Sequence, residues 1–263
     1  MELGLAGKVA LVGGASRGIG RAVAAALAAE GCRVAIGARN RQPLEEAARQ
    51  VEDATGSEVF PVPCDMSRYE DIRRFVSNTV ERFGGLDIVV NNAGGPPLGT
   101  FDQHTDERWQ AAIDQNLLSV VRTVREALPH LRRRGGGRVI NITSVAVKQP
   151  IDGLILSNAA RLGVVGLAKT LSRELGPDQI TVNNVCPGLT LTDRMRELYG
   201  SRAEAAGRSL EDLLAEEAGR IPTGRLGAPE DVAALVVFLA SAPARQITGT
   251  TIQVDGGSTT AVF

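Results

Sequence analysis

The chain has 263 residues, of which 43% are hydrophobic, 22% charged and only 3% aromatic, with a formal net charge of −1. These values suit one α/β domain with an aliphatic core that folds without disulfides or metals. A net charge near zero excludes the strong field that would gather nucleic acid or an anionic membrane, so we expect neither as a partner.

Strand-like and helix-like segments alternate along the chain, with short polar or glycine-rich joints between them. The predicted strands are residues 8–12, 33–38, 58–62, 86–91, 138–143, 180–186 and 251–255. The predicted helices are residues 18–30, 43–54, a third ending at 83, 105–134, 154–175 and 229–240, with a polar helical insert at about 193–219. Repeated β-α-β order implies right-handed crossovers and a parallel sheet with helices on both faces. We therefore predict a single doubly wound domain of about seven strands over residues 1–263.

Three of these helices carry further signals. Ser67 and Glu70 have the spacing of a capping box, which predicts the start of the third helix. The arginines at 132, 133 and 134 suit the end of a helix, where the macrodipole favours cations, better than a nucleic-acid patch. The helix at 154–175 is apolar around nearly its whole circumference, so it must be buried on two sides. The sheet covers one side, and we expect a second copy of the chain to cover the other.

A glycine-rich turn joins the first predicted strand to the first helix: residues 13–20 read Gly-Gly-Ala-Ser-Arg-Gly-Ile-Gly. Glycine lets the backbone turn tightly and approach a phosphate, and a helix N-terminus offers unpaired N–H groups to an anion. The alternative is a turn that serves close packing alone. Because the turn lies inside a β-α-β unit, it predicts a Rossmann-type dinucleotide site. The residues expected around the diphosphate are Gly14, Ser16, Arg17, Gly18, Ile19 and Gly20.

The residues expected at the adenosine ribose are basic or neutral. A dinucleotide fold usually places an acidic residue about twenty positions after the turn, where it holds the ribose hydroxyls. Here that distance falls on Arg39 and Asn40, and no acidic residue occurs between Glu30 and Glu45. Arginine favours a 2′-phosphate that a carboxylate would repel, and Arg17 supplies a second cation. The sequence therefore predicts NADP(H), with NAD(H) as the alternative.

Several motifs in this order make the chain resemble the short-chain dehydrogenase/reductase family over nearly its whole length, nearest to the 3-oxoacyl-[acyl-carrier-protein] reductase-like branch. The resemblance implies further coenzyme contacts at the adenine, the ribose and the nicotinamide. These contacts are Asp65, Met66, Asn92, Ala93, Gly94, Pro187, Gly188, Thr190 and Thr192. It also implies that the insert at 193–219 is a substrate lid.

The family's catalytic set is Asn, Ser, Tyr and Lys, and only half of it is present. Asn116 and Ser144 match the asparagine and the serine. The Tyr-x-x-x-Lys pair should begin thirteen residues after the serine, but those positions hold Ser157 and Arg161. In the family, tyrosine exchanges a proton with the substrate oxygen and lysine lowers the pKa of that tyrosine. A serine hydroxyl is a far weaker acid, and a guanidinium does not exchange protons in proteins.

Three functions follow from this pattern. The first is an NADP(H)-dependent oxidoreductase that interconverts small carbonyl and alcohol substrates, including 3-oxoacyl-type ones, with weakened proton transfer. The second is a catalytically impaired NADP(H)-binding sensor or partner subunit, and the third is isomerisation or dehydration in the same pocket. The resemblance also implies a homodimer or homotetramer. Tyr199, within the insert, is a candidate replacement for the missing proton donor.

The remaining signals concern metals and compartment. Cys32, Cys64 and Cys186 are odd in number and show no C-x-x-C spacing, which suits a reducing compartment. His104 and His130 are isolated, so we expect no metal site. No apolar run has membrane-spanning length, and the first residues, MELGLAGK, lack the features of an export signal. We therefore expect a cytoplasmic protein.

Overall fold

A seven-stranded sheet forms the centre of the computed structural model, which describes residues 2–262. The strand order is β3-β2-β1-β4-β5-β6-β7, and every neighbouring pair is parallel. The strands are β1 (Val9–Gly13), β2 (Arg33–Ala38), β3 (Val59–Pro63), β4 (Ile88–Asn91), β5 (Gly137–Ile142), β6 (Ile180–Pro187) and β7 (Thr251–Val254). Strand order reverses between β1 and β4, and such a reversal opens a crevice at the carboxyl ends of the strands. The predicted fold class is confirmed.

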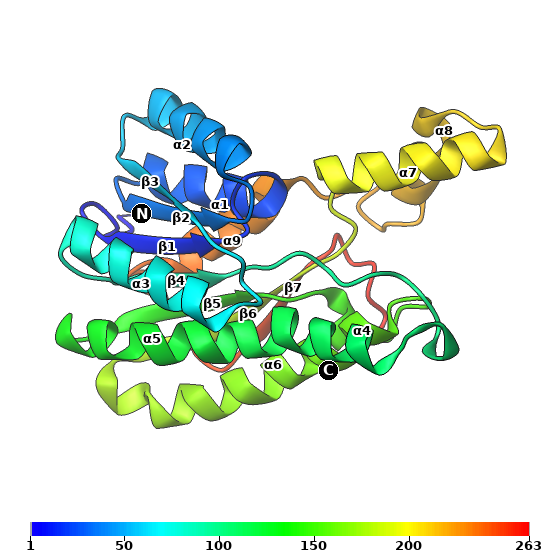
Figure 1. The fold of residues 1–263 in the computed structure, drawn as a ribbon. Helices are drawn as coiled ribbons and strands as arrows, with labels where there is room; N and C mark the ends of the chain where they lie inside the picture. Colours follow the sequence, from blue (N-terminus) through cyan, green and yellow to red (C-terminus); the bar gives the residue numbers. More distant parts are fainter. Residues whose placement is uncertain (1, 263) are drawn as a thin grey trace.

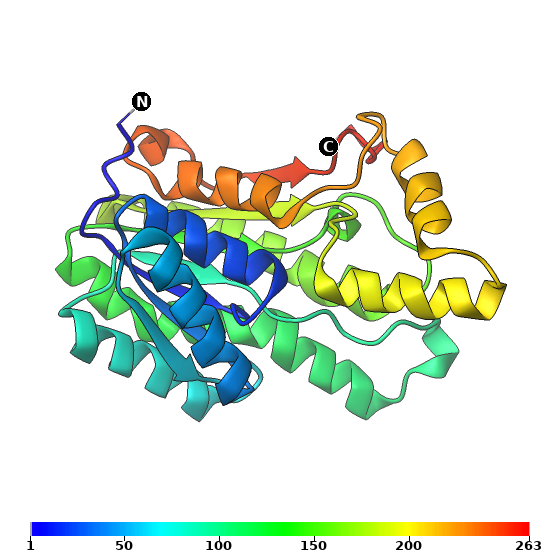
Figure 2. The same cartoon turned by 90° about the horizontal axis from the view of Figure 1, so that it is seen from above.

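Helices cover both faces of this sheet (Figure 1). One face carries α1 (Gly18–Ala29), α2 (Arg41–Thr55) and α9 (Pro229–Ala240). The other carries α3 (Tyr69–Phe83), α5 (Ser119–Arg133) and α6 (Ile155–Glu174). The shorter α4 (Asp106–Ile113) leads into α5, while α7 (Asp193–Ala206) and α8 (Leu210–Gly219) project beyond the carboxyl-terminal edge of the sheet (Figures 1 and 2). Within residues 2–262, no helix combines the length and the apolar character needed to cross a membrane.

The core consists of two aliphatic layers, one on each side of the sheet. Side chains of a strand alternate between faces, so Ala10 and Val12 pack under α1 and α9, whereas Val9 and Leu11 pack toward α3 and α5. Every residue of β1 is buried, as expected for a central parallel strand. The three cysteines are buried and free, and burial raises the pKa of Cys32 and of Cys64 to about 12.

Two local features differ from the sequence prediction. The capping box at Ser67 and Glu70 is wrong: Arg68 is the N-cap residue of α3, and the Ser67 hydroxyl donates to Asp65 Oδ1 at 2.8 Å. That carboxylate, two residues before Ser67 and just after β3, accepts from both the hydroxyl and the N–H of Ser67, which holds the serine outside the helix. The predicted long helix at 105–134 is interrupted by η2, a π-helical turn over Asp114–Leu118.

A row of buried amides crosses the carboxyl half of the sheet. Asn91 Nδ2 donates to Asn141 Oδ1 at 2.8 Å, and Asn141 Nδ2 donates to Asn184 Oδ1 at 2.9 Å. Asn184 Nδ2 in turn donates to Thr251 Oγ1 at 3.0 Å. These four residues are direct neighbours across β4, β5, β6 and β7. The row supplies partners to these buried amides, except for Asn91 Oδ1, which has none among the described residues, and it fixes the register of the four strands.

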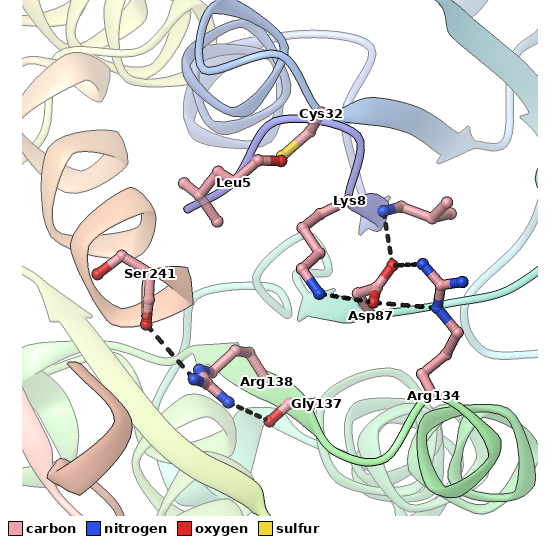
Figure 3. Close-up of polar contacts among 9 residues, drawn as sticks. Leu5, Lys8, Cys32, Asp87, Arg134, Gly137, Arg138 and Ser241 are labelled. Carbon is pink, nitrogen blue, oxygen red and sulfur yellow. Dashed lines mark hydrogen bonds and ion pairs between the residues drawn. The ribbon is translucent and has the colours of Figure 1, made fainter. Parts of the chain in front are cut away.

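A buried carboxylate, Asp87, organises the opposite, amino-terminal edge (Figure 3). Its two oxygens accept hydrogen bonds from Arg134 Nε and Nη2 at 3.2 and 3.1 Å. The Val9 N–H and Lys8 Nζ also donate to it, at 2.9 and 3.3 Å. Burial alone raises the pKa of Asp87, but the bonds from Arg134 and Val9 and the charge of Lys8 outweigh it, so the pKa lies below its usual value. This cluster ties the start of β1 to the end of α5.

We expect Asp87→Asn to lower the free energy of unfolding by about 2–3 kcal/mol near neutral pH, because it leaves Arg134 without its charged acceptor. The folded pKa is depressed, so this contribution is complete above the unfolded value of about 4 and is lost as the pH falls below it. Urea unfolding of both proteins as a function of pH measures the effect. A difference that grows as the pH falls below about 4 would contradict the assignment.

Candidate active site

The turn between β1 and α1 has the geometry of an anion site. Gly14 has a φ of +59°, and a Cβ there would lie 2.8 Å from Asn92 Nδ2 and 2.9 Å from its carbonyl oxygen, so only glycine fits. Arg17 is the N-cap residue of α1, and its side chain does not cap the helix. The first amides of α1 therefore remain available to a ligand at the positive end of the helix dipole.

Asn92 holds this turn from the neighbouring strand. It follows β4 directly, and its Nδ2 donates to the carbonyl oxygens of Gly13 at 3.1 Å and of Gly14 at 3.3 Å. Met66 lies below the same turn, with its Cε 3.3 Å from the position of a Cβ at Gly13. The structure thus brings together the predicted residues after β1, β3 and β4.

The two predicted arginines follow adjacent strands. Gly13 and Gly37 are register partners in β1 and β2, so Arg17 and Arg39 both lie just beyond the same edge of the sheet. Arg39 is exposed and forms no ion pair within residues 2–262, whereas Arg17 Nη1 donates to Glu197 Oε1 of α7 at 2.8 Å. Asn40 is the N-cap residue of α2. Arg39 is thus free to bind a phosphate, whereas Arg17 is ion-paired with the insert.

The loop after β6 lies against the glycine-rich turn. Pro187 ends β6, and the Gly188 N–H donates to the Val254 carbonyl at 3.0 Å. The buried Thr190 hydroxyl donates to the Gly188 carbonyl at 3.2 Å, and Thr192 caps α7 by accepting from the Met195 N–H. Thr192 Cγ2 lies 3.2 Å from the position of a Cβ at Gly18. The start of the insert therefore contacts the turn that opens α1, at the carboxyl-terminal edge of the sheet.

Ser144 and Asn116 occupy specialised backbone positions. Ser144 follows β5 and caps a 3₁₀ turn, with its Oγ accepting from the Ala146 N–H at 3.1 Å. Asn116 lies within the π-helical turn, where its Nδ2 donates to the Ala112 carbonyl at 3.1 Å. Its buried Oδ1 has no partner among the described residues. A π-helical turn breaks the regular hydrogen-bond pattern of an α-helix, and such turns occur often at functional sites.

Ser157 and Arg161 lie one turn apart on the buried face of α6. They are 5% and 8% exposed, and their spacing places them on the same side of the helix. Arg161 Nη1 donates to the carbonyl oxygens of Ile142 at 2.9 Å and of Thr143 at 3.3 Å. Its Nη2 donates to the Ala93 carbonyl at 3.3 Å. The guanidinium therefore bridges the ends of β4 and β5, beside Ser144 and Gly94.

The charge of Arg161 is held without a carboxylate partner. Burial, together with the nearby Arg194, lowers the pKa of Arg161 to about 10. At neutral pH the group still carries its proton, and three neutral carbonyls solvate it. It supplies positive potential to the crevice, but it does not act as a proton relay.

Two contacts of the insert were missed from the sequence. Arg194 Nη1 donates to the Gly95 carbonyl at 3.2 Å, and Glu197 pairs with Arg17 as described above. Both residues lie on α7 and connect it to the loops after β4 and β1. No local pattern marks them, because their partners are about a hundred or more positions away in sequence.

Tyr199 lies inside the insert. It is 7% exposed, with the Arg202 guanidinium 5.3 Å from its ring centroid. Burial raises its pKa, with the nearby Glu217 of α8 as the next cause. Tyr199 lies on α7 and packs toward α8. Its charged neighbours are Arg202 on α7, Glu217 on α8 and Arg220 just after α8. Within residues 2–262, no group of His, Cys, Asp or Glu side chains is spaced to hold a metal ion.

The chain is similar to known reductases along its length. The family described as "Enoyl-(Acyl carrier protein) reductase" matches residues 14–259. The 3-oxoacyl-[acyl-carrier-protein] reductase FabG of Staphylococcus epidermidis is 36% identical over 250 residues, covering 95% of this chain and 98% of that protein. Human "Dehydrogenase/reductase SDR family member 4" is 36% identical over 255 residues, covering 97% of this chain and 88% of that protein.

A solved structure extends this likeness to three dimensions. L-sorbose reductase from Gluconobacter frateurii, complexed with NADPH and L-sorbose, is 34% identical, superposes with a TM-score of 0.97, and each chain is covered in full. The resemblance drawn from the motifs is thereby confirmed, and the chain belongs to the short-chain dehydrogenase/reductase family.

Proposed function

We propose that the protein is an NADP(H)-dependent oxidoreductase that interconverts carbonyl and alcohol groups of small molecules, with weakened proton transfer. The observation that carries this proposal is the unpaired Arg39 at the end of β2, beside a glycine-rich turn and with no competing carboxylate. A solved structure of high similarity is a complex with NADPH, which supports the same coenzyme here.

The residues of the crevice fit a dinucleotide. The turn at Gly14 and the first amides of α1 would hold the diphosphate, and Arg39 and Arg17 would hold the 2′-phosphate. The bound coenzyme would supply the hydride. Ser144 would hydrogen-bond the substrate oxygen, while Arg161 would keep the pocket positive.

Proton transfer is the weak point of this site. Ser157 is a poor acid near neutral pH, and Arg161 is committed to three carbonyls. General acid–base assistance typically contributes about 10²–10⁴-fold, so turnover would be slow rather than absent. The same two residues favour a second candidate, a catalytically impaired NADP(H)-binding sensor or partner subunit.

The insert and the outer face of α6 complete the proposal. We assign residues 193–219 as a substrate lid of this single domain, because α7 and α8 project beyond the carboxyl-terminal edge of the sheet and Arg194 and Glu197 of α7 contact the loops after β4 and β1. Leu162, on the outer face of α6, is 54% exposed, and we expect a second copy of the chain to cover it in a homodimer or homotetramer. A monomer in light scattering would contradict that assembly.

Coenzyme binding tests the proposal directly. We expect Arg39→Ala to raise the Kd for NADPH about 10- to 100-fold in calorimetry and to leave that for NADH nearly unchanged, because one charge-assisted contact to the phosphate is lost. Glu197→Gln should act in the opposite direction, since it releases Arg17 from its ion pair. Arg49→Ala, at an exposed arginine further along α2, is the control.

The proposal would be contradicted if calorimetry detected no binding of NADPH or NADH, or if the protein bound NADH more tightly than NADPH. NADPH oxidation over a panel of ketones and 3-oxoacyl thioesters then separates the two candidates. Slow turnover supports the oxidoreductase, and tight binding without any turnover supports the sensor.

A further inference from the structure

A cavity lies at the amino-terminal edge of the sheet, opposite the edge that we expect to bind the coenzyme. Its volume is about 480 Å³, within the range of small-molecule sites. It lies where β1, β4, β5 and β6 begin (Figure 3). Its polar lining includes Lys8, Asp87, Arg134, Arg138, Thr181 and Arg245. None of these residues belongs to the proposed coenzyme or substrate site.

The lining has a large excess of positive charge. Four cationic side chains and a single carboxylate face the cavity. Asp87 already accepts bonds from Arg134, Lys8 and the Val9 N–H. Arg138 and Arg245 form no ion pair with any residue between 2 and 262. Two guanidinium groups therefore line the cavity without an opposite charge.

Arg138 shows this imbalance most clearly. The half-buried guanidinium donates to two neutral carbonyls, those of Gly137 at 3.0 Å and Ser241 at 3.5 Å (Figure 3). Its Nε has no partner among the described residues, nor has the buried Thr181 hydroxyl in the same lining. Burial lowers the pKa of Arg138, and no carboxylate opposes that effect. An incomplete set of partners around a buried charge costs stability unless a ligand completes it.

We propose that this cavity binds a small phosphate-bearing anion, with Arg138 and Arg245 as its charged ligands. Their side chains come from β5 and from the segment after α9, and so reach the cavity from separate elements. A tetrahedral phosphate presents oxygens in several directions and can bind both guanidinium groups. A planar carboxylate needs only one guanidinium, which binds its two oxygens with two parallel N–H groups. Arg138 lies near the start of β5 and Ser144 just beyond its end, and the four residues of strand between Arg138 and Ile142 alone span about 13 Å, so both sites can be filled at once.

Calorimetry with inorganic pyrophosphate on the NADPH-saturated protein tests this site. We expect binding with the coenzyme present, weakened about 10- to 100-fold by Arg138→Gln and more mildly by Arg245→Gln. Arg138→Lys should retain part of the affinity. Arg173→Gln, an exposed arginine of α6 outside the cavity, is the control.

The coenzyme turn also attracts phosphates, so a double comparison is needed. Arg39→Ala should leave pyrophosphate binding to the saturated protein unchanged, and Arg138→Gln should leave NADPH binding unchanged. If the chain bound no NADPH, the dependence of pyrophosphate binding on Arg138 would still report on this cavity alone.

Three results would overturn the proposal: no heat from pyrophosphate, equal binding to the wild type and Arg138→Gln, or citrate binding as tightly as pyrophosphate. If Arg138→Gln failed to fold, Arg245→Gln would decide, because Arg245 is exposed.

Discussion

Replacing Ser157 with tyrosine and Arg161 with lysine in one protein is expected to raise carbonyl-dependent NADPH oxidation about 10²- to 10⁴-fold. The two positions lie one turn apart on the buried face of α6, beside Ser144. Tyrosine would supply the acid that serine lacks, and an adjacent ammonium would lower the pKa of its phenol. The initial rate with a ketone that the wild type turns over slowly, or not at all, measures the gain.

Both substitutions are needed for this result. Arg161 bridges three carbonyls, of Ile142, Thr143 and Ala93, and a lysine ammonium cannot reproduce that planar fork. Arg161→Lys alone should therefore lower the melting temperature without raising the rate. Ser157→Tyr alone should give a smaller gain, because its phenol would lack the nearby ammonium.

Ser144→Ala in the double variant is the control, since it removes the hydroxyl expected to meet the substrate oxygen. The gain should then be largely lost. A folded double variant that binds NADPH but shows no gain would contradict either the alignment of Ser157 and Arg161 or the carbonyl pocket itself.

Gly20→Ala should raise the Kd for NADPH about 10- to 100-fold and lower the free energy of unfolding by about 1–3 kcal/mol. A Cβ at this position would overlap the Gly14 carbonyl oxygen and approach Asn92 Nδ2 to 2.8 Å. Gly14 belongs to the turn that would hold the diphosphate, and Asn92 donates to the carbonyls of that turn, so relieving the overlap must move the amides of the turn. Calorimetry and urea unfolding measure the two effects.

Gly200→Ala is the matched control, because it makes the same change within helix α7. A Cβ there meets nothing within 4 Å. This variant should gain about 0.5–1 kcal/mol of stability from the helix propensity of alanine and keep its affinity for NADPH. Unchanged NADPH binding by Gly20→Ala would contradict the placement of the diphosphate.

The sequence alone determined the architecture of the domain. Alternation of aliphatic strands and amphipathic helices is a local pattern. It predicted the seven parallel strands, with bounds that differ from the observed ones by two residues or fewer. Carboxyl ends of parallel strands meet at one edge, so residues after β1, β2, β4, β5 and β6 could be predicted to lie at the same edge of the sheet before their contacts were known. The resemblance to the family also predicted, from the spacing after Ser144, that Ser157 and Arg161 stand where the family has tyrosine and lysine.

Tertiary structure alone decided the partners of the charged and polar groups. Arg17 pairs with Glu197, Arg161 bridges two strand ends, and Arg138 lines a cavity without a counter-charge. A hydrogen bond or ion pair depends on distances of a few ångströms between segments far apart in the chain, and only the packing of helices on the sheet sets those distances.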